Sequence, residues 1–544
     1  MSRGHYLMVG LRPSDLVEIA DTARTLGERR HRATLLYLYA RTEIDAHASA
    51  FDALARMSAD GAPGLTTIAL DMLAIHQGAF ENSRSVAEVI DQRQSRLTVD
   101  LEGATAPVAP GLWPKVWRRL RDPKGTFEVL VNVGPTFMGL IRHVPVRLWP
   151  QAFTTARRAN DAVLVYKRFL SFFARTLREL TIDASIIPED IVGPIWPVLI
   201  RAAHDAHIPV LVCPYTLANQ QEAIQSLKSQ SAFQTGENAI ANHLYPSWRF
   251  HDAEVDLVRL PSEHIFAHEE LGITPPDPWM MNSGFADRIL VDSDASLEYF
   301  RAGGIPPEQM AVVGSVSQDR MHALRQKRTT ALQGLRSELN LADEKPLWLI
   351  SGCPNQLSAT VPFCEFATIE HVARFVGESL APLAESYHLV VRPHPNFMEF
   401  GAMLARYGIT STTLPTSSLV PLAEVFVAFA SATIRWAIAC GLPTINYDVF
   451  HYGYSDFSAA KGVRTVADGV EFRQLVRSLT PGSPALQALA ANAREDSAYW
   501  GVMDGRGIER IENEIERARE RRMNSPKPAF AQTLRRNKEQ QPNA

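Results

Sequence analysis

The feature that most constrains this chain is the repeated alternation of short apolar runs with helical stretches. The runs HYLMVG (5–10) and ATLLYLYA (33–40) flank an amphipathic helix pattern that extends from Ser14 to about Leu26. An apolar run without a polar face is typical of a strand that helices cover on both sides, as in a parallel sheet. The opening of the chain therefore predicts an α/β fold.

Further apolar runs of strand length continue along the chain. In the first half they are TTIALDMLAI (66–75), FEVLVNV (127–133), IDASIIP (182–188) and IPVLVCP (208–214), with helical patterns at 44–63, 80–98 and 195–206. In the second half they are ADRILVDS (286–293), AVVGS (311–315), PLWLISG (346–352), YHLVVRPHP (387–395), EVFVAFA (424–430) and LPTINYD (442–448), with helical patterns at 365–383, 431–441 and 483–520. Strands that alternate with helices in this way predict doubly wound, Rossmann-like parallel sheets.

A length of 544 residues is too great for a single hydrophobic core and predicts two large domains. A proline cluster at 275–278 disfavours helix and marks the expected boundary. We therefore expect one Rossmann-like domain over 1–278 and a second over 279–495, with a cleft between them. A helix over 496–522 could pack back on the first domain, and the basic tail 523–544 has the composition of a disordered segment.

Charge and cysteine content exclude several classes of protein. The net charge is −4, so no global excess of positive charge indicates a nucleic-acid partner. The four cysteines are widely spaced, as expected for reduced thiols in the cytoplasm. The sequence contains neither a secretory signal nor an apolar run of about eighteen residues, so we expect a cytoplasmic protein without a membrane span.

The segment GLWPKVWRRLRDPKG (111–125) allows two interpretations. Its mixture of tryptophans and basic residues suits peripheral contact with the inner face of a membrane. A short helix with buried tryptophans fits as well, and we favour it because Pro114 and Pro123 limit the length of any helix.

The loop VVRPHPN (390–396) carries the clearest candidate chemistry. Ligands of doubly wound sheets bind beyond the carboxyl ends of the strands, and here Arg392 and His394 leave such an end together. Arginine offers a forked donor and histidine a second donor, which suits a phosphate or diphosphate group. The alternative is a surface loop in which Arg392 pairs with a carboxylate.

The segment FASATIRWAIACGLP (429–443) follows the next expected strand end. Ser431 and Thr433 stand where the strand turns into a helix, so free backbone N–H groups and two hydroxyls would meet an anion there. The alternative is that Ser431 only caps the helix. Arg435, one turn on, would face either the ligand or solvent.

Two further strand ends are candidates. In VVGSVSQDR (312–320), Gly314 would let the backbone approach a ligand closely and Ser315 would add a hydroxyl, although a plain tight turn explains the run equally well. In IIPEDIVGPIWP (186–197), Glu189 or Asp190 could be the base that deprotonates an acceptor hydroxyl. The alternative is acidic charge that favours the start of a helix.

No metal site is expected. The pattern Asp292-x-Asp294 resembles a metal motif, but it lies at a strand-to-helix turn where Asp294 is a natural N-cap. The P-loop, the dinucleotide fingerprint GxGxxG after the first strand and the GxSxG elbow are all absent. We therefore expect no cofactor beyond the substrate itself.

Three of these segments resemble one enzyme superfamily. The segment ADRILVDSDASLEYFRAGGIPPEQMAVVGS (286–315) resembles the opening of the C-terminal domain of GT-B glycosyltransferases. VVRPHPN (390–396) resembles a strand end of capsule polysaccharide transferases and CDP-glycerol glycerophosphotransferases. EVFVAFASATIRWAIACGLPTINYD (424–448) is similar to the phosphate-binding segment of this superfamily, which includes UDP-N-acetylglucosamine 2-epimerases.

The resemblance implies a GT-B glycosyltransferase that uses a nucleotide-sugar donor in surface-polysaccharide synthesis, by inverting, metal-independent transfer to a glycan or lipid-linked acceptor. Gly314, Arg392, His394, Ser431 and Thr433 would line the donor pocket. His394 would act with Arg392 on the leaving diphosphate. A UDP-sugar 2-epimerase, a glycerophosphotransferase and a non-catalytic sugar-nucleotide binding protein stay open as alternatives. The His-x-Glu-Ala-Gly stretch of the epimerases is replaced here by CPYTLANQQEA (213–223).

Overall fold

The computed structural model describes residues 3–40, 47–61, 63–77, 136–213, 220–228, 230–251, 255–355, 357, 364–394, 397–429 and 431–524. The strand expected at 127–133, the helix expected at 80–98, the tryptophan-containing segment 111–125 and the tail from 525 onward lie outside these residues.

The described residues form two compact units. The first holds those up to Cys213, those from Gln220 to Ile289 and those from Ile515 onward, whereas the second holds Leu290–Glu514. The division therefore falls at 289/290, beyond the proline cluster at 275–278, and the first unit is discontinuous in sequence.

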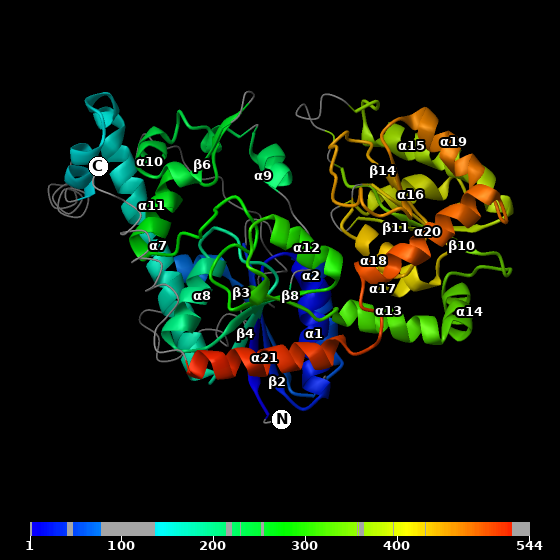
Figure 1. The fold of residues 1–544 in the computed structure, drawn as a ribbon, viewed down its shortest axis with the longest axis horizontal. Coiled ribbons are helices and arrows are strands. Elements are labelled where there is room, and N and C mark those ends of the chain that lie inside the picture. Colours follow the sequence, from blue (N-terminus) through cyan, green and yellow to red (C-terminus); the bar gives the residue numbers. More distant parts are fainter. Residues whose placement is uncertain are drawn as a thin grey trace, which may run out of the picture. The chain divides into compact units, whose positions relative to one another are not determined.

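The first sheet has seven strands in the order β3-β2-β1-β4-β5-β8-β9 (Figure 1). They are β1 (His5–Gly10), β2 (Arg32–Tyr39), β3 (Leu65–Asp71), β4 (Ala184–Ile187), β5 (Val210–Val212), β8 (Arg288–Val291) and β9 (Met310–Val312). The pairings from β3 through β8 are parallel. The direction of strand addition reverses between β1 and β4, which is the switch point of a Rossmann fold.

The second sheet has six strands in the order β12-β11-β10-β13-β14-β15, all of whose pairings are parallel. They are β10 (Leu347–Ser351), β11 (His388–Arg392), β12 (Thr410–Ser411), β13 (Val425–Ala428), β14 (Thr444–Tyr447) and β15 (Val463–Val466). This is again the Rossmann strand order, with its switch point between β10 and β13. The prediction of two Rossmann-like sheets is confirmed.

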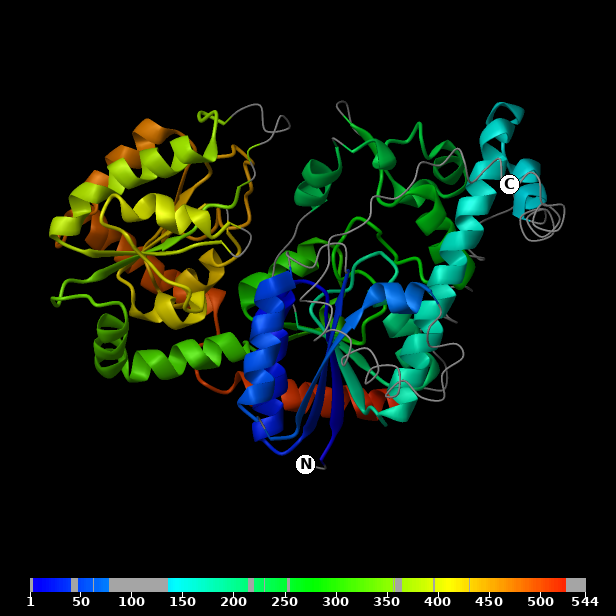
Figure 2. The same cartoon turned by 180° about the vertical axis from the view of Figure 1, so that it is seen from behind.

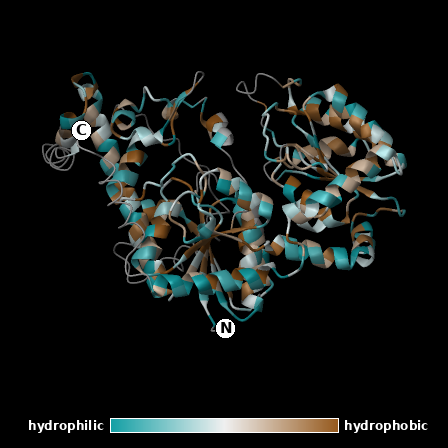
Figure 3. Ribbon diagram, in the orientation of Figure 1, coloured by the Kyte–Doolittle hydropathy of each residue, from teal (hydrophilic) through white to brown (hydrophobic). Residues whose placement is uncertain are grey.

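Helices bury the faces of both sheets, and several carry both hydrophobic and hydrophilic residues (Figure 3). In the first unit they are α1 (Leu16–Glu28), α2 (Ala48–Ala59), α3 (Met72–His76), α7 (Trp149–Glu179), α8 (Trp196–Asp205), α9 (Gln220–Leu227), α10 (Ala239–Leu244) and α11 (Ser262–Leu271), beside a small antiparallel pair, β6 (Arg249–His251) and β7 (Asp256–Val258). In the second they are α12 (Asp294–Ala302), α13 (Val316–Gln326), α14 (Arg328–Glu338), α15 (Ile369–Leu380), α16 (Glu399–Ala405), α17 (Thr416–Leu419), α18 (Ile434–Ala439), α19 (Gly469–Ser478) and α20 (Pro484–Trp500).

The last helix, α21 (Gly507–Met523), ends in the first unit. Arg519 binds Asp183, which immediately precedes β4, at 2.8 Å. Arg522 binds Asp287, which immediately precedes β8. These two ion pairs fix the end of α21 to the amino-terminal edge of the first sheet (Figures 1 and 2).

Three details differ from the sequence predictions. The strands β8 and β9, which were assigned to a domain beginning at 279, belong to the first sheet. The run 66–75 is split at Asp71, whose carboxylate accepts the Leu73 N–H at 2.9 Å and so starts α3. The helix expected over 496–522 is α21, which begins at Gly507 and follows a separate helix, α20.

Candidate functional site

The carboxyl edge of the second sheet brings together the loops after β11, β10 and β13. The Gly352 N–H, just after β10, donates to the Arg392 carbonyl at 2.7 Å. A Cβ on Gly352 would lie 2.5 Å from the His394 nitrogen and from Pro393 Cα. Only glycine therefore lets the loop after β11 lie this close to the end of β10.

Arg392 is the central charge of this edge. One of its nitrogens, Nη1, donates to the Pro393 carbonyl at 2.7 Å, while the buried Nε has no hydrogen-bond partner among the described residues. Burial lowers the pKa of the guanidinium from its ordinary value. Within the described part of the chain no carboxylate pairs with Arg392, so the surface ion-pair alternative is not supported. A desolvated cation without a counter-charge favours an anionic ligand.

His394 lies two residues beyond Arg392 and is partly buried. The Phe397 N–H donates to its carbonyl at 2.9 Å, which closes the loop. Burial, and then the charge of Arg392, lower the pKa of the imidazole, so the ring is neutral at pH 7. It can donate one hydrogen bond without adding a second full charge.

Ser431 and Thr433 form the turn that leads into α18. Their hydroxyl oxygens are 2.9 Å apart, and the Thr433 N–H donates to Ser431 Oγ at 3.3 Å. Ser431 thus shapes the turn, and both side chains stay partly exposed. Since neighbouring strands lie about 4.8 Å apart, the loops after β11 and β13, with β10 between them, begin roughly 10 Å apart, a span that suits a diphosphate with its sugar.

Arg435 has a different place from either prediction. It does not face solvent, because its side chain is only 4% exposed, and its Nη1 lies 3.3 Å from Oδ2 of Asp292, the residue directly after β8. The Asp292 carboxylate also accepts the Ser296 hydroxyl at 2.6 Å. In the adjoining turn Ser293, not Asp294, caps α12 by accepting the Ser296 N–H. The structure therefore assigns Arg435 to a buried ion pair.

Gly314 and Ser315 follow β9 and so belong to the end of a different sheet from Arg392. Gly314 has a left-handed backbone with φ of 77°, which favours glycine. Ser315 caps α13 by accepting the Gln318 N–H.

The polar groups of α13 bind a segment of the chain itself. Gln318 accepts the Val502 N–H at 3.2 Å. Asp319 accepts the N–H groups of Gly507 and Ile508. The loop after β9 therefore holds the connection between α20 and α21, and the structure does not bring it together with the loops after β11 and β13.

In the first sheet, Glu189 lies just beyond β4 and next to the switch point. Its carboxylate pairs with Arg12, which follows β1, at 2.7 Å and accepts the Trp196 indole N–H at 3.3 Å. Burial raises the pKa of Glu189, while Arg12 partly opposes that rise. The Glu189 side chain is 6% exposed and the Arg12 side chain 49%, so Arg12 forms the solvent side of the pair.

Asp190 has its carboxylate committed to the backbone. It accepts the Ala286 N–H at 3.0 Å and a bond from the Phe285 N–H, and burial raises its pKa to about 6. Its own N–H donates to the Asn282 side chain, and its carbonyl accepts the Asn282 N–H. A Cβ on Gly284 would lie 2.2 Å from the carboxylate. Through these hydrogen bonds, Asp190 stabilises the turn before β8.

We expect Asp190→Asn to destabilise the fold by about 1–3 kcal/mol at pH 7.5, because an amide NH2 would face a buried backbone N–H that then lacks an acceptor. Turnover per folded molecule should stay near the wild-type value. Urea unfolding, with Asp205→Asn as an exposed control, measures the first quantity, and a steady-state assay measures the second. A fully stable variant with greatly reduced turnover would instead return Asp190 to the catalytic role.

The sequence analysis missed several residues near these edges. Arg12 follows the first strand by two residues, so the strand-end rule could have found it. Arg259 follows β7, and its buried Nε has no hydrogen-bond partner among the described residues. Asp448, after β14, accepts the N–H groups of Tyr452 and Gly453 and so shapes another loop of the second sheet's carboxyl edge.

Across the part of the chain that the structure describes, no group of three histidine, cysteine or acidic side chains could hold a metal ion. In the same residues, no helix combines the length and the apolar character that crossing a membrane requires.

The comparisons with known proteins found similar chains only among solved structures. No family model matches the sequence, and no curated protein matches it. Among solved structures, the chain is similar to a UDP-GlcNAc 2-epimerase from Neisseria meningitidis, with 10% identity and a TM-score of 0.46 over 94% of this chain and 100% of that one. It is similar to the glycotransferase of kitacinnamycin, with 13% identity and a TM-score of 0.45 over 95% and 100% of the two chains.

A third similar structure is the wall teichoic acid polymerase TagF, with 14% identity and a TM-score of 0.34 over 44% of this chain and 59% of that one. The three are of the kinds that the sequence resemblance named. At these identities and TM-scores, the likeness carries no argument about activity.

Proposed function

We propose that this chain is a glycosyltransferase that transfers a sugar from a nucleotide-activated donor during the synthesis of a bacterial surface polysaccharide or glycan. The observation that supports this most directly is Arg392, a desolvated guanidinium at the end of β11 whose Nε has no hydrogen-bond partner among the described residues. The proposed site of action is the cytoplasm, at the inner face of the membrane, with a glycan or lipid-linked acceptor.

In this proposal the donor diphosphate binds between the loops after β11 and β13. Arg392 supplies a full positive charge, and His394, Ser431 and Thr433 supply hydrogen-bond donors. Charge on the diphosphate grows as its bond to the sugar breaks, so donors held at these loops stabilise the transition state more than the bound substrate. No metal takes part.

Inverting transfer also needs a base for the acceptor hydroxyl, and Glu189 is our candidate. The acceptor oxygen attacks the anomeric carbon while its proton passes to the Glu189 carboxylate, and the nucleoside diphosphate leaves. Burial raises the pKa of Glu189, and a carboxylate with a raised pKa is a stronger base than an ordinary glutamate.

The experiment that tests the proposal is a thermal-shift screen of the full chain against UDP, CDP, GDP, CMP and their sugars. A ligand that binds only the folded state raises the melting temperature. Stabilisation by one nucleotide family, followed by release of that nucleotide in the presence of a glycan acceptor, would support a transferase. Formation of an epimerised sugar nucleotide instead, or no shift with any compound, would contradict it.

The role of Glu189 predicts a specific pH profile. The ionised carboxylate is the active form, so kcat/KM should fall as the pH drops through a pKa above that of an ordinary glutamate. Arg12 opposes the rise of this pKa, so Arg12→Gln should move the acid limb to higher pH, and Glu189→Gln should remove most of the turnover. Arg24→Gln, a change at a partly exposed arginine on α1 that does not contact Glu189, is the matched control. An unchanged profile in Arg12→Gln, or full turnover in Glu189→Gln, would exclude Glu189 as the base.

A further inference from the structure

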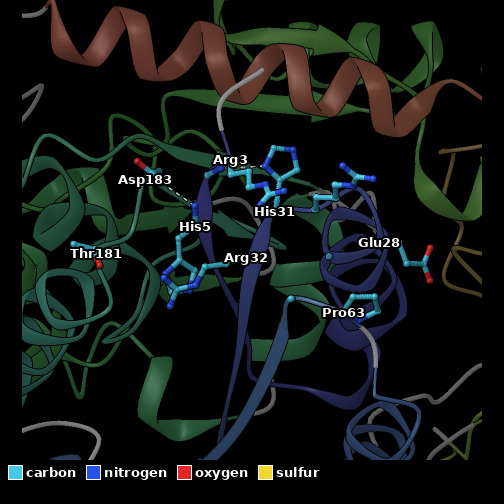
Figure 4. Close-up of a pocket in the computed structure, with 12 residues that line it drawn as sticks. Arg3, His5, Glu28, His31, Arg32, Pro63, Thr181 and Asp183 are labelled. Carbon is cyan, nitrogen blue, oxygen red and sulfur yellow. Dashed lines mark hydrogen bonds between the residues drawn. The ribbon is translucent and has the colours of Figure 1, made fainter.

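A separate cavity of about 670 Å3 opens at the amino-terminal edge of the first sheet (Figure 4). The segments that lead into β1, β2, β3 and β4 line it. Parallel strands have all their carboxyl ends at one edge, so this cavity lies at the opposite edge of the sheet from Glu189. The proposed reaction places neither its donor nor its base in this cavity.

The cavity is rich in positive charge that no acid balances. Arg3, Arg30 and Arg32 line it, are exposed, and have no ion-pair partner among the described residues. The two acids of the lining both have other partners. Asp183 accepts the His5 N–H and pairs with Arg519, each at 2.8 Å, and Glu28 pairs with Arg24 at 3.9 Å.

Two histidines also line the cavity. Burial, and then the charge of Arg32, lower the pKa of His5, and its ring contacts the Leu180 carbonyl and the Thr34 hydroxyl. His31 is buried, and its Nδ1 accepts the Gly4 N–H at 3.2 Å. The three arginines therefore set the charge of the cavity, and the histidines help to shape it.

The walls of the cavity are held by close backbone packing. The Arg32 N–H donates to the Gly4 carbonyl at 2.9 Å, and the Ala33 N–H donates to the Gly64 carbonyl at 2.8 Å. A Cβ on Gly64 would lie 2.3 Å from the His31 carbonyl oxygen, so these turns meet at a contact that only glycine permits. A ligand would therefore meet a preformed surface, which lowers the entropy cost of binding.

Arg30 follows the end of α1 in a left-handed conformation, with φ of 75°. The His31 N–H donates to the Leu26 carbonyl at 3.1 Å, which is the hydrogen bond of a common helix C-terminal motif. Glycine adopts this conformation at little cost, so the backbone alone does not require arginine here. The Arg30 side chain is exposed and contributes a charge to the cavity.

We propose that this cavity binds a small anion with at least two phosphate groups. Three unpaired guanidinium groups suit several phosphate oxygens, because arginine forms forked, charge-assisted bonds to them. The volume lies in the range of small-molecule sites and well above the size of one phosphate. This site is independent of the proposed donor site at Arg392.

The test measures the binding of inorganic pyrophosphate by calorimetry. Pyrophosphate would also bind at the proposed donor site, so every protein carries Arg392→Gln. In that background, adding Arg30→Gly and Arg32→Gln should weaken pyrophosphate binding about tenfold or more, because charged hydrogen bonds are lost. Arg30→Gly suits the left-handed backbone, so the melting temperature should not fall. Binding should also weaken as salt is added.

The matched control is Arg178→Gln in the same background, an exposed arginine on α7 that does not line the cavity, and it should bind pyrophosphate unchanged. Two results would overturn the proposal. One is no pyrophosphate binding by the protein with Arg392→Gln alone, and the other is equal affinity with and without the Arg30 and Arg32 changes. Neither result bears on the proposed donor site, because the nucleotide screen of the unaltered chain tests that site separately.

Discussion

Replacing Arg392 with glutamine is expected to lower turnover roughly a hundredfold to a thousandfold, the usual cost of losing one preorganised donor to a developing negative charge. Glutamine keeps a donor and much of the length of the side chain but removes the positive charge. The charge matters here because the guanidinium is largely desolvated, and electrostatic interactions are stronger where water is excluded. The stabilisation of the folded chain by its nucleotide should fall in parallel.

The fold itself should tolerate Arg392→Gln. Among the described residues, its side chain donates one hydrogen bond, to the neighbouring Pro393 carbonyl, so no long-range hydrogen bond in that part of the chain depends on it. Arg464→Gln, an exposed arginine on β15 of the same sheet, is the matched control and should keep full turnover. A folded Arg392→Gln protein with wild-type turnover and an unchanged nucleotide shift would remove this residue from the proposed donor site.

Replacing Arg435 with methionine should destabilise the second unit by about 3–5 kcal/mol, since it leaves a buried charge without its partner. Asp292 and Arg435 are each 4% exposed, and no solvent reaches the carboxylate to replace the guanidinium. The Ser293 and Ser296 hydroxyls still donate to Asp292, but they carry no positive charge. Urea unfolding measures this decrease in the free energy of unfolding.

The double variant Asp292→Asn with Arg435→Met separates the ion pair from simple packing. It removes both charges, so it should be more stable than Arg435→Met alone. A single variant that keeps full stability but loses nucleotide binding would contradict the ion-pair assignment and favour a direct ligand contact. A loss of stability supports the ion pair and a loss of nucleotide binding supports a ligand contact, so measuring both quantities decides between the two roles.

The strands were predictable because most are runs of apolar residues that are buried on both faces of a sheet. Which sheet each strand joins was harder to predict. The three residues of β9, Met310–Val312, carry no information about which sheet they join, and the proline cluster at 275–278 precedes the true division. The long helix α7 was missed because alanines such as Ala152, Ala156 and Ala159 form its buried face and give a weak periodic signal.

The candidate site shows the same limit. Arg392, His394, Ser431 and Thr433 could be found because the strand-end rule needs only local sequence. The partner of Arg435 could not, since Asp292 lies far away in the chain and only the packed fold brings the two together. The same holds for Asp190, whose hydrogen bonds go to the turn at 282–286.

The path of α21 also bears on how the protein is made. Arg519 and Arg522 are the partners of Asp183 and Asp287, yet the ribosome adds them after all the strands of both sheets. Domains usually fold as they emerge, beginning with the amino-terminal one. Here the second unit ends at Glu514, whereas the first also needs the residues from Ile515 onward. We therefore expect a nascent chain that stops at residue 514 to leave the first unit incomplete and prone to bind chaperones.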